Sequence, residues 1–168
     1  MNAKLIVEGK EFDIQIMDPE LQNLIRPPKK NGYERVDLHE NYWTDDGHGY
    51  VSVESEDSFE ADDNLYNAAN YYSDKTVAEN NARADALMRK LRRFAVEHRE
   101  YEIDWEDKQT IKYYIYYDYT VSRLFLGCNY CNRQFGAIFF RSQENAELAI
   151  DTFRDELIWY FTEYKDSL

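Results

Sequence analysis

The fold is decided by the segment SDKTVAENNARADALMRKLRRFAVEH, residues 73–98, whose apolar residues have helical periodicity. The spacing of these residues would place them on one face of a helix. They are Val77, Ala84, Leu87, Met88, Leu91 and Ala95. Either Ser73 or Asp74 can accept a hydrogen bond from the first turn and so begin the helix. We therefore predict one long amphipathic helix that ends at about His98.

Upstream of this helix, the sequence predicts a small antiparallel sheet. Aromatic and β-branched residues at 42–43 and 50–53 flank a turn over residues 44–49, which is typical of a hairpin. Residues 70–72 predict a short third strand, and the acidic residues 54–63 are expected to loop over the surface.

Downstream of the helix, the same order of elements returns. Strands are predicted over residues 111–119, 121–128 and 135–140, and Ser142 is suited to cap a closing helix that continues through Phe161. The fold class expected is α+β, with two antiparallel ββ(β)α units over residues 33–100 and 101–168. Each unit would be closed by a long amphipathic helix. We interpret the repeated order as an internal duplication. The alternative is chance, because a strand followed by a cap and a helix is a common order of elements.

Residues 1–32 are expected to form a separate N-terminal segment. Two apolar runs, 4–8 and 11–16, predict a β-hairpin around a Gly9-Lys10 turn, with Val7 opposite Phe12 and Leu5 opposite Ile14. The triplet Asp18-Pro19-Glu20 predicts the start of a short helix. Residues 27–32 predict a linker.

Negative charge is concentrated in one window of the sequence. The chain has a formal net charge of -13. Between Glu34 and Asp63 it has eleven carboxylates and one cation, Arg35. Such a field repels nucleic acid and attracts basic protein surfaces. The candidate partner-binding carboxylates are Glu54, Glu56, Asp57, Glu60, Asp62 and Asp63. The alternative is a solvated loop, neutralised in part by the arginine-rich end of the long helix.

The segment IKYYIYYDYTV, residues 111–121, contains a second candidate contact surface. In an extended strand, alternate side chains point to opposite faces. Tyr114 and Tyr116 would therefore share the face opposite to that of Ile115. Two rigid aromatic side chains on one face are typical of an interface, although a solvent-facing strand explains them equally well.

No residue pattern in the sequence selects a catalytic, metal or cofactor site. Cys128 and Cys131 form a lone CxxC without the second ligand pair that structural zinc needs, so free thiols are expected. The stretch RQFGAIFF, residues 133–140, approaches the strand signature of RNA-recognition domains. Core packing of Phe135, Ile138 and Phe140 is the interpretation we favour, because no helix separates the preceding strands.

Length and composition limit the cellular context. A chain of 168 residues forms one medium domain or two small ones. No stretch approaches the roughly 20 apolar residues of a membrane span, and the N-terminus lacks the apolar core of a signal peptide. We therefore expect a protein of the cytoplasm that has no bound cofactor.

Three stretches resemble a family of small proteins carried by phages and mobile elements of Gram-positive bacteria. They are KLIVEGKEFDIQI with PELQNLIRPPKKNGYERV (4–36), NAANYYSDKTVAENNARADALMRKLRRFA (67–95), and YYIYYDY (113–119) with FGAIFFRSQENAELAIDTF (135–153). Some such proteins are type II-A anti-CRISPR proteins, which inhibit the RNA-guided effector nuclease. The resemblance implies that role, and it implies no catalytic residue.

The resulting hypothesis is a non-catalytic inhibitor of a basic nucleic-acid-binding bacterial protein. Its expected target is a type II CRISPR effector nuclease, with or without guide RNA, and its expected effect is on guide RNA or target DNA handling. Two other classes stay open. One is an RNA-directed protein, either a binder with direct RNA contact or a metal-dependent nuclease that acts on guide RNA. The other is a structural phage protein that self-associates.

Overall fold

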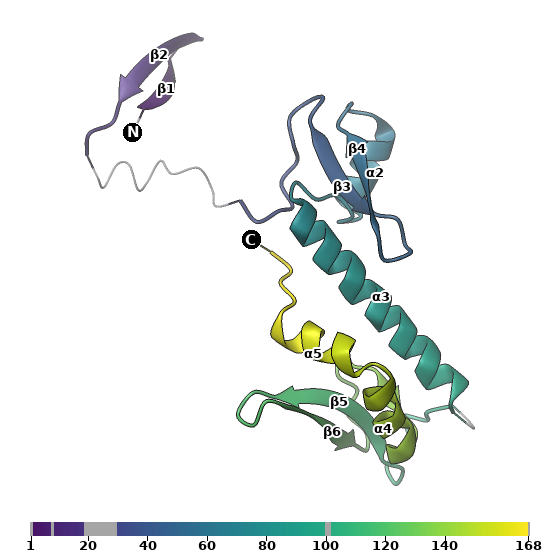
Figure 1. Cartoon of the computed structure of the whole chain (residues 1–168). Helices are drawn as coiled ribbons and strands as arrows, with labels where there is room; N and C mark the ends of the chain where they lie inside the picture. Colours follow the sequence, from purple (N-terminus) through teal and green to yellow (C-terminus); the bar gives the residue numbers. More distant parts are fainter. Residues whose placement is uncertain (1, 8, 19–29, 100–101, 168) are drawn as a thin grey trace. The chain divides into compact units, whose positions relative to one another are not determined.

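The computed structural model describes residues 2–7, 9–18, 30–99 and 102–167 (Figure 1). The fold is mixed α+β, as predicted. The chain divides into two compact units, Met1–Asn31 and Gly32–Leu168. The segments 33–100 and 101–168 therefore belong to a single compact unit, in which helix α3 (Lys75–Glu97) contacts elements of both.

The first unit contains an antiparallel hairpin of β1 (Asn2–Val7) and β2 (Lys10–Gln15). The hairpin was predicted, but its register was wrong by two residues. Leu5 lies opposite Phe12 and Val7 lies opposite Lys10, so Lys10 belongs to β2 and not to the turn. Gly9 has a φ of 76°, and a turn with this left-handed backbone favours glycine at that position. The predicted short helix and the first half of the predicted linker, residues 27–29, lie outside the described residues.

The second unit begins with a hairpin of β3 (Asn41–Asp45) and β4 (Val51–Ser55), close to the predicted strands. The predicted third strand is reduced to one bridge between Trp43 and Tyr72. The prediction of an acidic loop over 54–63 holds only for residues 56–59, because β4 continues to Ser55 and helix α2 spans Glu60–Asn67. Oδ2 of Asp62 accepts a hydrogen bond from the Phe59 backbone at 2.9 Å, which stabilises the beginning of this helix.

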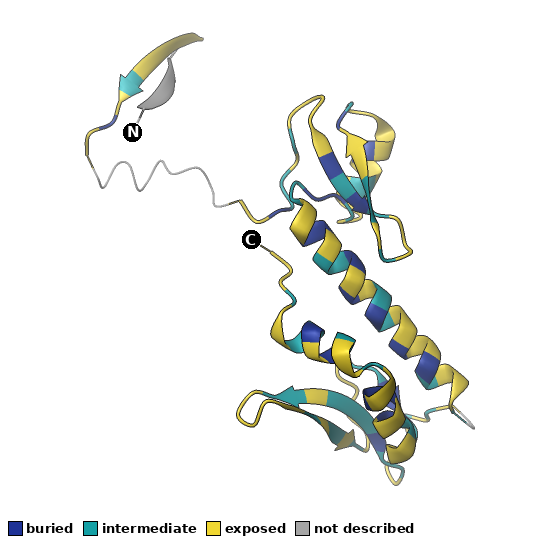
Figure 2. Cartoon of the chain, viewed as in Figure 1, coloured by how far each residue is buried: buried dark blue, intermediate teal, exposed yellow. Residues whose placement is uncertain are grey.

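Helix α3 has the predicted start and the predicted apolar face. The Asp74 carboxylate accepts a hydrogen bond from the Val77 backbone at 3.0 Å and caps the helix. In Figure 2 the buried residues of α3 form a stripe along its length. Val77 packs in a cluster with Tyr72, and Leu91 packs in a larger cluster with Phe140.

A three-stranded antiparallel sheet of strand order β6-β5-β7 follows α3. Its strands are β5 (Lys112–Asp118), β6 (Arg123–Asn129) and β7 (Phe139–Phe140). Two helices follow, α4 (Gln143–Thr152), which Ser142 caps as predicted, and α5 (Arg154–Thr162). The predicted single closing helix is thus interrupted at Phe153, whose ring packs edge-on against Phe94 at 5.6 Å.

The third strand of this sheet is shorter than predicted. Only Phe139 and Phe140 pair with β5, and the residues before them form a loop in which Gly136 has a φ of 77°. The prediction of Phe135 as a core residue was wrong, because its side chain is fully exposed. The predicted burial of Phe140 is confirmed. The left-handed turn at Gly136 interrupts the extended backbone that would have brought Phe135 into the sheet.

Candidate functional site

Residues 34–63 form an anionic lobe built from β3, β4 and the first turn of α2. Arg35 is the one cation of this lobe. Two of the eleven carboxylates, Glu56 and Asp62, are buried. Six are exposed to solvent: Asp37, Glu40, Asp46, Glu54, Glu60 and Asp63. The lobe therefore keeps a negative surface although part of its charge is internal.

Glu56 is a structural residue of the lobe. Its side chain is 2% exposed, and it accepts hydrogen bonds from Nε and Nη2 of Arg35 at 2.8 and 2.9 Å. The Tyr71 hydroxyl donates a third hydrogen bond at 2.9 Å. The Arg35 guanidinium lowers the pKa of Glu56 to about 2, with help from Tyr71. A carboxylate enclosed in this way is not available to a partner.

Asp62 is the second internal carboxylate. It accepts a hydrogen bond from the Tyr42 hydroxyl at 2.8 Å, which together with the Phe59 backbone lowers the pKa of Asp62. The rings of Tyr42 and Tyr71 stack with centroids 3.8 Å apart, so the Asp62 and Glu56 interactions form one connected core. Burial raises the pKa of Tyr71 to about 12.

The other four predicted carboxylates lie nearer the solvent. Asp63 is bound by Nη1 of Arg35 at 2.6 Å, and Asp57 lies 3.0 Å from Nδ1 of His39. The carboxylates of Glu54 and Glu60 are exposed and form no hydrogen bond or ion pair with another described residue. The structure thus brings the six predicted residues into one lobe, and Glu54 and Glu60 remain fully open to a partner.

The arginine-rich end of α3 does not neutralise this lobe. Arg89 lies 3.9 Å from Asp45, which is the one ion pair between this part of α3 and the lobe within the described chain. Lys90 is paired with Glu156 on α5, and Arg93 with Glu97 on α3 itself. The sequence-based alternative of a loop neutralised by this helix therefore holds only for Asp45.

Tyr114 and Tyr116 lie on the predicted face of β5. The opposite face, with Ile115 and Leu126, packs into the core cluster. Tyr116 is 39% exposed and stacks on Phe125 of β6, which is 40% exposed, at a centroid distance of 6.0 Å. The ring centroids of Tyr114 and Tyr116 are 6.2 Å apart, so the outer face of the sheet carries a continuous aromatic surface.

Two residues fix the position of this surface. A Cβ atom built on Gly127 would lie 2.3 Å from the Tyr114 ring. The ring therefore lies across β6 because Gly127 has no side chain. The buried Lys112 donates a hydrogen bond from Nζ to the Tyr130 carbonyl at 2.6 Å and another to the Asp107 carbonyl. The lysine thereby joins the loop after α3 to the end of β6.

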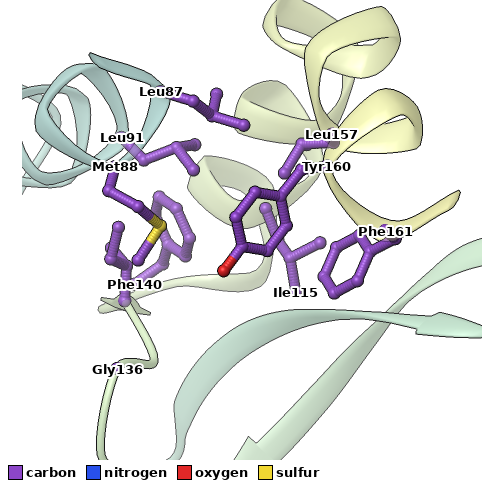
Figure 3. A pocket seen from close by; sticks show the side chains of 10 residues that line it. Leu87, Met88, Leu91, Ile115, Gly136, Phe140, Leu157, Tyr160 and Phe161 are labelled. Carbon is purple, nitrogen blue, oxygen red and sulfur yellow. The ribbon is translucent and has the colours of Figure 1, made fainter. Parts of the chain in front are cut away.

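An apolar cavity of about 190 Å³ lies between α3, α5 and the sheet. Figure 3 shows Leu87, Met88 and Leu91 on one side and Leu157, Tyr160 and Phe161 on another. These residues belong to the core cluster or pack against it. Apart from the Tyr160 hydroxyl, the side chains that line the cavity have no polar group that could orient a ligand. We therefore assign the cavity to the packing of the core.

Three remaining features are the two cysteines, the possible metal ligands and the helices. Cys128 and Cys131 are free, exposed thiols, as expected. Among the described residues, no group of three or more His, Cys, Asp or Glu is placed to hold a metal ion. No helix in the described ranges combines the length and apolarity needed to cross a bilayer.

Comparison with known proteins gives no relative. No family model, curated protein or solved structure matches the chain.

Proposed function

We propose that the chain is a non-catalytic inhibitor that binds a basic nucleic-acid-binding bacterial protein through its anionic lobe. One observation supports this function most directly. The one cation of the lobe, Arg35, is bound to Glu56 and Asp63, while six carboxylates remain exposed. The surface field of the lobe is therefore negative over the whole window.

Such a lobe competes with polynucleotide for a cationic surface. Duplex DNA presents a dense row of phosphates, and proteins that hold it meet this charge with lysine and arginine. Exposed carboxylates on a folded lobe reach the same cations. Charges of this kind mainly raise the association rate and set the salt dependence, whereas buried aromatic contacts supply most of the affinity. Tyr116 and Phe125 are available for such contacts.

The proposed target is a type II CRISPR effector nuclease, and this choice rests on the resemblance of the sequence to anti-CRISPR proteins. Such a nuclease holds guide and target in a positively charged channel and reads a short duplex motif with arginines. The inhibitor would act in the bacterial cytoplasm and interfere with guide RNA or target DNA handling. No observation favours a metal-dependent nuclease that acts on guide RNA.

A charge-matched pair of variants tests the proposal. The lobe variant combines Asp37→Asn, Glu54→Gln and Glu60→Gln, whose carboxylates form no hydrogen bond or ion pair with described residues. The control variant removes three exposed carboxylates elsewhere, with Glu106→Gln, Glu147→Gln and Glu163→Gln. Both variants have the same net charge, so a difference between them reports the position of the charges.

The measurement is the association rate with a purified type II effector nuclease, by surface plasmon resonance at low and high salt. We expect the lobe variant to associate about tenfold more slowly at low salt, and the difference to shrink as salt screens the field. The control should associate nearly as fast as the wild type. Equal rates for the two variants would remove the lobe as the contact surface, and absence of any binding would remove this target.

A further inference from the structure

Positive charge is also concentrated in this acidic chain. From Tyr119 to Gln143 there are 25 residues with no Asp or Glu and with three arginines. The segment from Arg89 to Arg99, which covers the last turns of α3 and the two residues after it, has five cations and one acid, Glu97. Both segments lie outside the anionic lobe.

These two cationic segments meet at a surface hollow of about 420 Å³. Arg92 of α3 lines it on one side, and Arg133 and Phe135 from the β6–β7 loop line it on the other. A second hollow shares Arg92 and is also lined by Arg99 and Arg141. Four arginines, Arg92, Arg99, Arg133 and Arg141, therefore line the two hollows.

The charge at the larger hollow is available to a ligand. Within the described chain, neither Arg92 nor Arg133 forms an ion pair. The Arg133 guanidinium lies 5.8 Å from the ring centroid of Trp105, a contact that leaves its hydrogen-bond donors open. Both arginines are exposed. An anion in the hollow would therefore meet two charges without breaking an existing pair.

Phe135 supplies an aromatic ring at the same place. Its side chain is fully exposed, although most residues of this type are at least partly buried. The neighbouring Gly136 has a φ of 77° and makes the turn that holds Phe135 outside the sheet. A fully solvated ring between unpaired arginines is a stacking surface for a planar, negatively charged ligand.

A row of aromatic rings continues from this hollow across the outer face of the sheet. Trp105 packs edge-on against Phe139 at 4.8 Å, and Phe139 lies 5.5 Å from Tyr114. The row then passes to the exposed pair Tyr116 and Phe125. The Trp105 ring next to Arg133 is thereby joined to the exposed rings through Phe139, which is itself buried. The exposed rings are therefore Phe135 at one end and Tyr116 with Phe125 at the other.

We propose that this arginine–aromatic track, formed by Arg92, Arg133, Phe135, Tyr114, Tyr116 and Phe125, binds single-stranded nucleic acid. Phosphates would pair with Arg92 and Arg133, one base would stack on Phe135, and a later base would stack on Tyr116 and Phe125. The combination of unpaired guanidinium groups with exposed rings favours a nucleic acid over an acidic peptide, because every base has a π-face. A single strand is favoured over a duplex, since its bases are free to leave their own stack.

The net charge of the chain does not prevent this contact. At physiological ionic strength the field of an exposed charge decays over about 8 Å. The acid-free segment 119–143 and the cationic end of α3 therefore supply positive charge at the track, and Asp104 and Glu106, which flank Trp105, supply the nearest negative charge in sequence. Oligonucleotide binding to this track requires no nuclease, so it is measured on the chain alone. If no oligonucleotide binds, the proposed inhibition through the anionic lobe is not affected.

The test uses a fluorescein-labelled 12-nucleotide oligo(U) RNA, with oligo(dT) beside it, and fluorescence anisotropy at 20 to 200 mM salt. We expect the wild type to bind, with a salt slope of about -1.4, as two phosphate contacts predict for a single strand. Arg92→Gln with Arg133→Gln should abolish that slope. Phe135→Ser should weaken binding at least about fivefold with the slope unchanged.

Matched controls keep composition constant. Arg93→Gln with Arg154→Gln removes two exposed arginines outside the track, and Tyr50→Ser removes an exposed aromatic ring from the anionic lobe. Both controls should bind like the wild type. Because all of these side chains are exposed, thermal unfolding should show that every variant is folded.

Three outcomes would overturn the proposal. One is no oligonucleotide binding by the wild type at 20 mM salt, and another is equal binding by the track variants and their controls. The third is preferential binding of polyglutamate or of a second copy of the chain. Competition between polyglutamate and the labelled oligonucleotide would reveal the first partner. Light scattering would reveal a dimer of the chain. Loss confined to the track variants, with RNA preferred over polyglutamate, supports the proposal.

Discussion

Replacing Glu56 by glutamine separates the internal role of this carboxylate from the surface role of its neighbours. The change keeps the side-chain size but removes the charge bound by Arg35, and it places an NH2 group among donors from Arg35 and Tyr71. One hydrogen bond to a charged group contributes about 1.5–3 kcal/mol, and breaking a fully buried ion pair costs about 3–5 kcal/mol. Because the Arg35 side chain is 35% exposed, solvent weakens the pair. We therefore expect the free energy of unfolding to fall by about 2 kcal/mol, less than for a fully buried pair.

Urea and thermal unfolding followed by circular dichroism measure this loss. For a chain of this size, about 2 kcal/mol lowers Tm by about 4–8 °C. The control is Glu54→Gln, an exposed carboxylate two residues earlier, for which we expect a change within about 0.5 kcal/mol. Equal stability of the two variants would contradict this expectation, because the Arg35–Glu56 pair would then contribute no more to stability than an exposed carboxylate does.

Two further predictions follow from the same contacts. The pKa of Glu56 is lowered to about 2 in the folded chain from an ordinary 4.5, so the stability difference between wild type and Glu56→Gln should be full above pH 4.5 and should vanish as pH falls toward 2. Urea titrations at several pH values check this, and a difference that stays constant down to pH 2 would contradict it. Gly127→Ala should push the Tyr114 ring off β6 and destabilise the chain by about 1 kcal/mol, visible as changed ring shifts of Tyr114 and Tyr116 in NMR spectra. Unchanged shifts would mean that the ring does not use the space above Gly127.

The elements that the sequence predicted well are those in which periodicity and a cap agree. Helix α3 has both an apolar stripe and Asp74, and its observed start and buried face follow from these two signals. Helix α2 was missed because its residues have few apolar side chains. Its one usable signal was Asp62, three residues after Phe59, where a carboxylate can bind the backbone at the start of a helix.

The candidate site shows the limit of counting charges in a sequence. Glu54 and Glu56 are the same residue type, two positions apart in an acidic stretch. In the structure Glu54 faces solvent, whereas Glu56 is bound by Arg35. That difference depends on Tyr71, which is far away in sequence. The arginine–aromatic track was missed for a similar reason, since Phe135 was assigned to the core. The absence of acids between Tyr119 and Gln143 was the signal that could have revealed it.

The two charged surfaces touch at one ion pair within the described chain, Arg89 with Asp45 at 3.9 Å, and are otherwise spaced along α3. Val77 packs in the cluster with Tyr72, next to the anionic lobe, whereas Arg92 lines the hollow of the track. Fifteen residues of helix separate these positions, which is about 22 Å at 1.5 Å per residue. The Arg89–Asp45 pair neutralises its own two charges, whereas Arg92 on one surface and Glu54 and Glu60 on the other form no ion pair with a described residue. Each surface therefore keeps its exposed charge. A protein with bound nucleic acid presents both basic side chains and phosphates. The anionic lobe can contact the basic side chains, and the arginine–aromatic track can contact the phosphates. Charge removal at the lobe should therefore leave oligonucleotide binding unchanged at physiological salt.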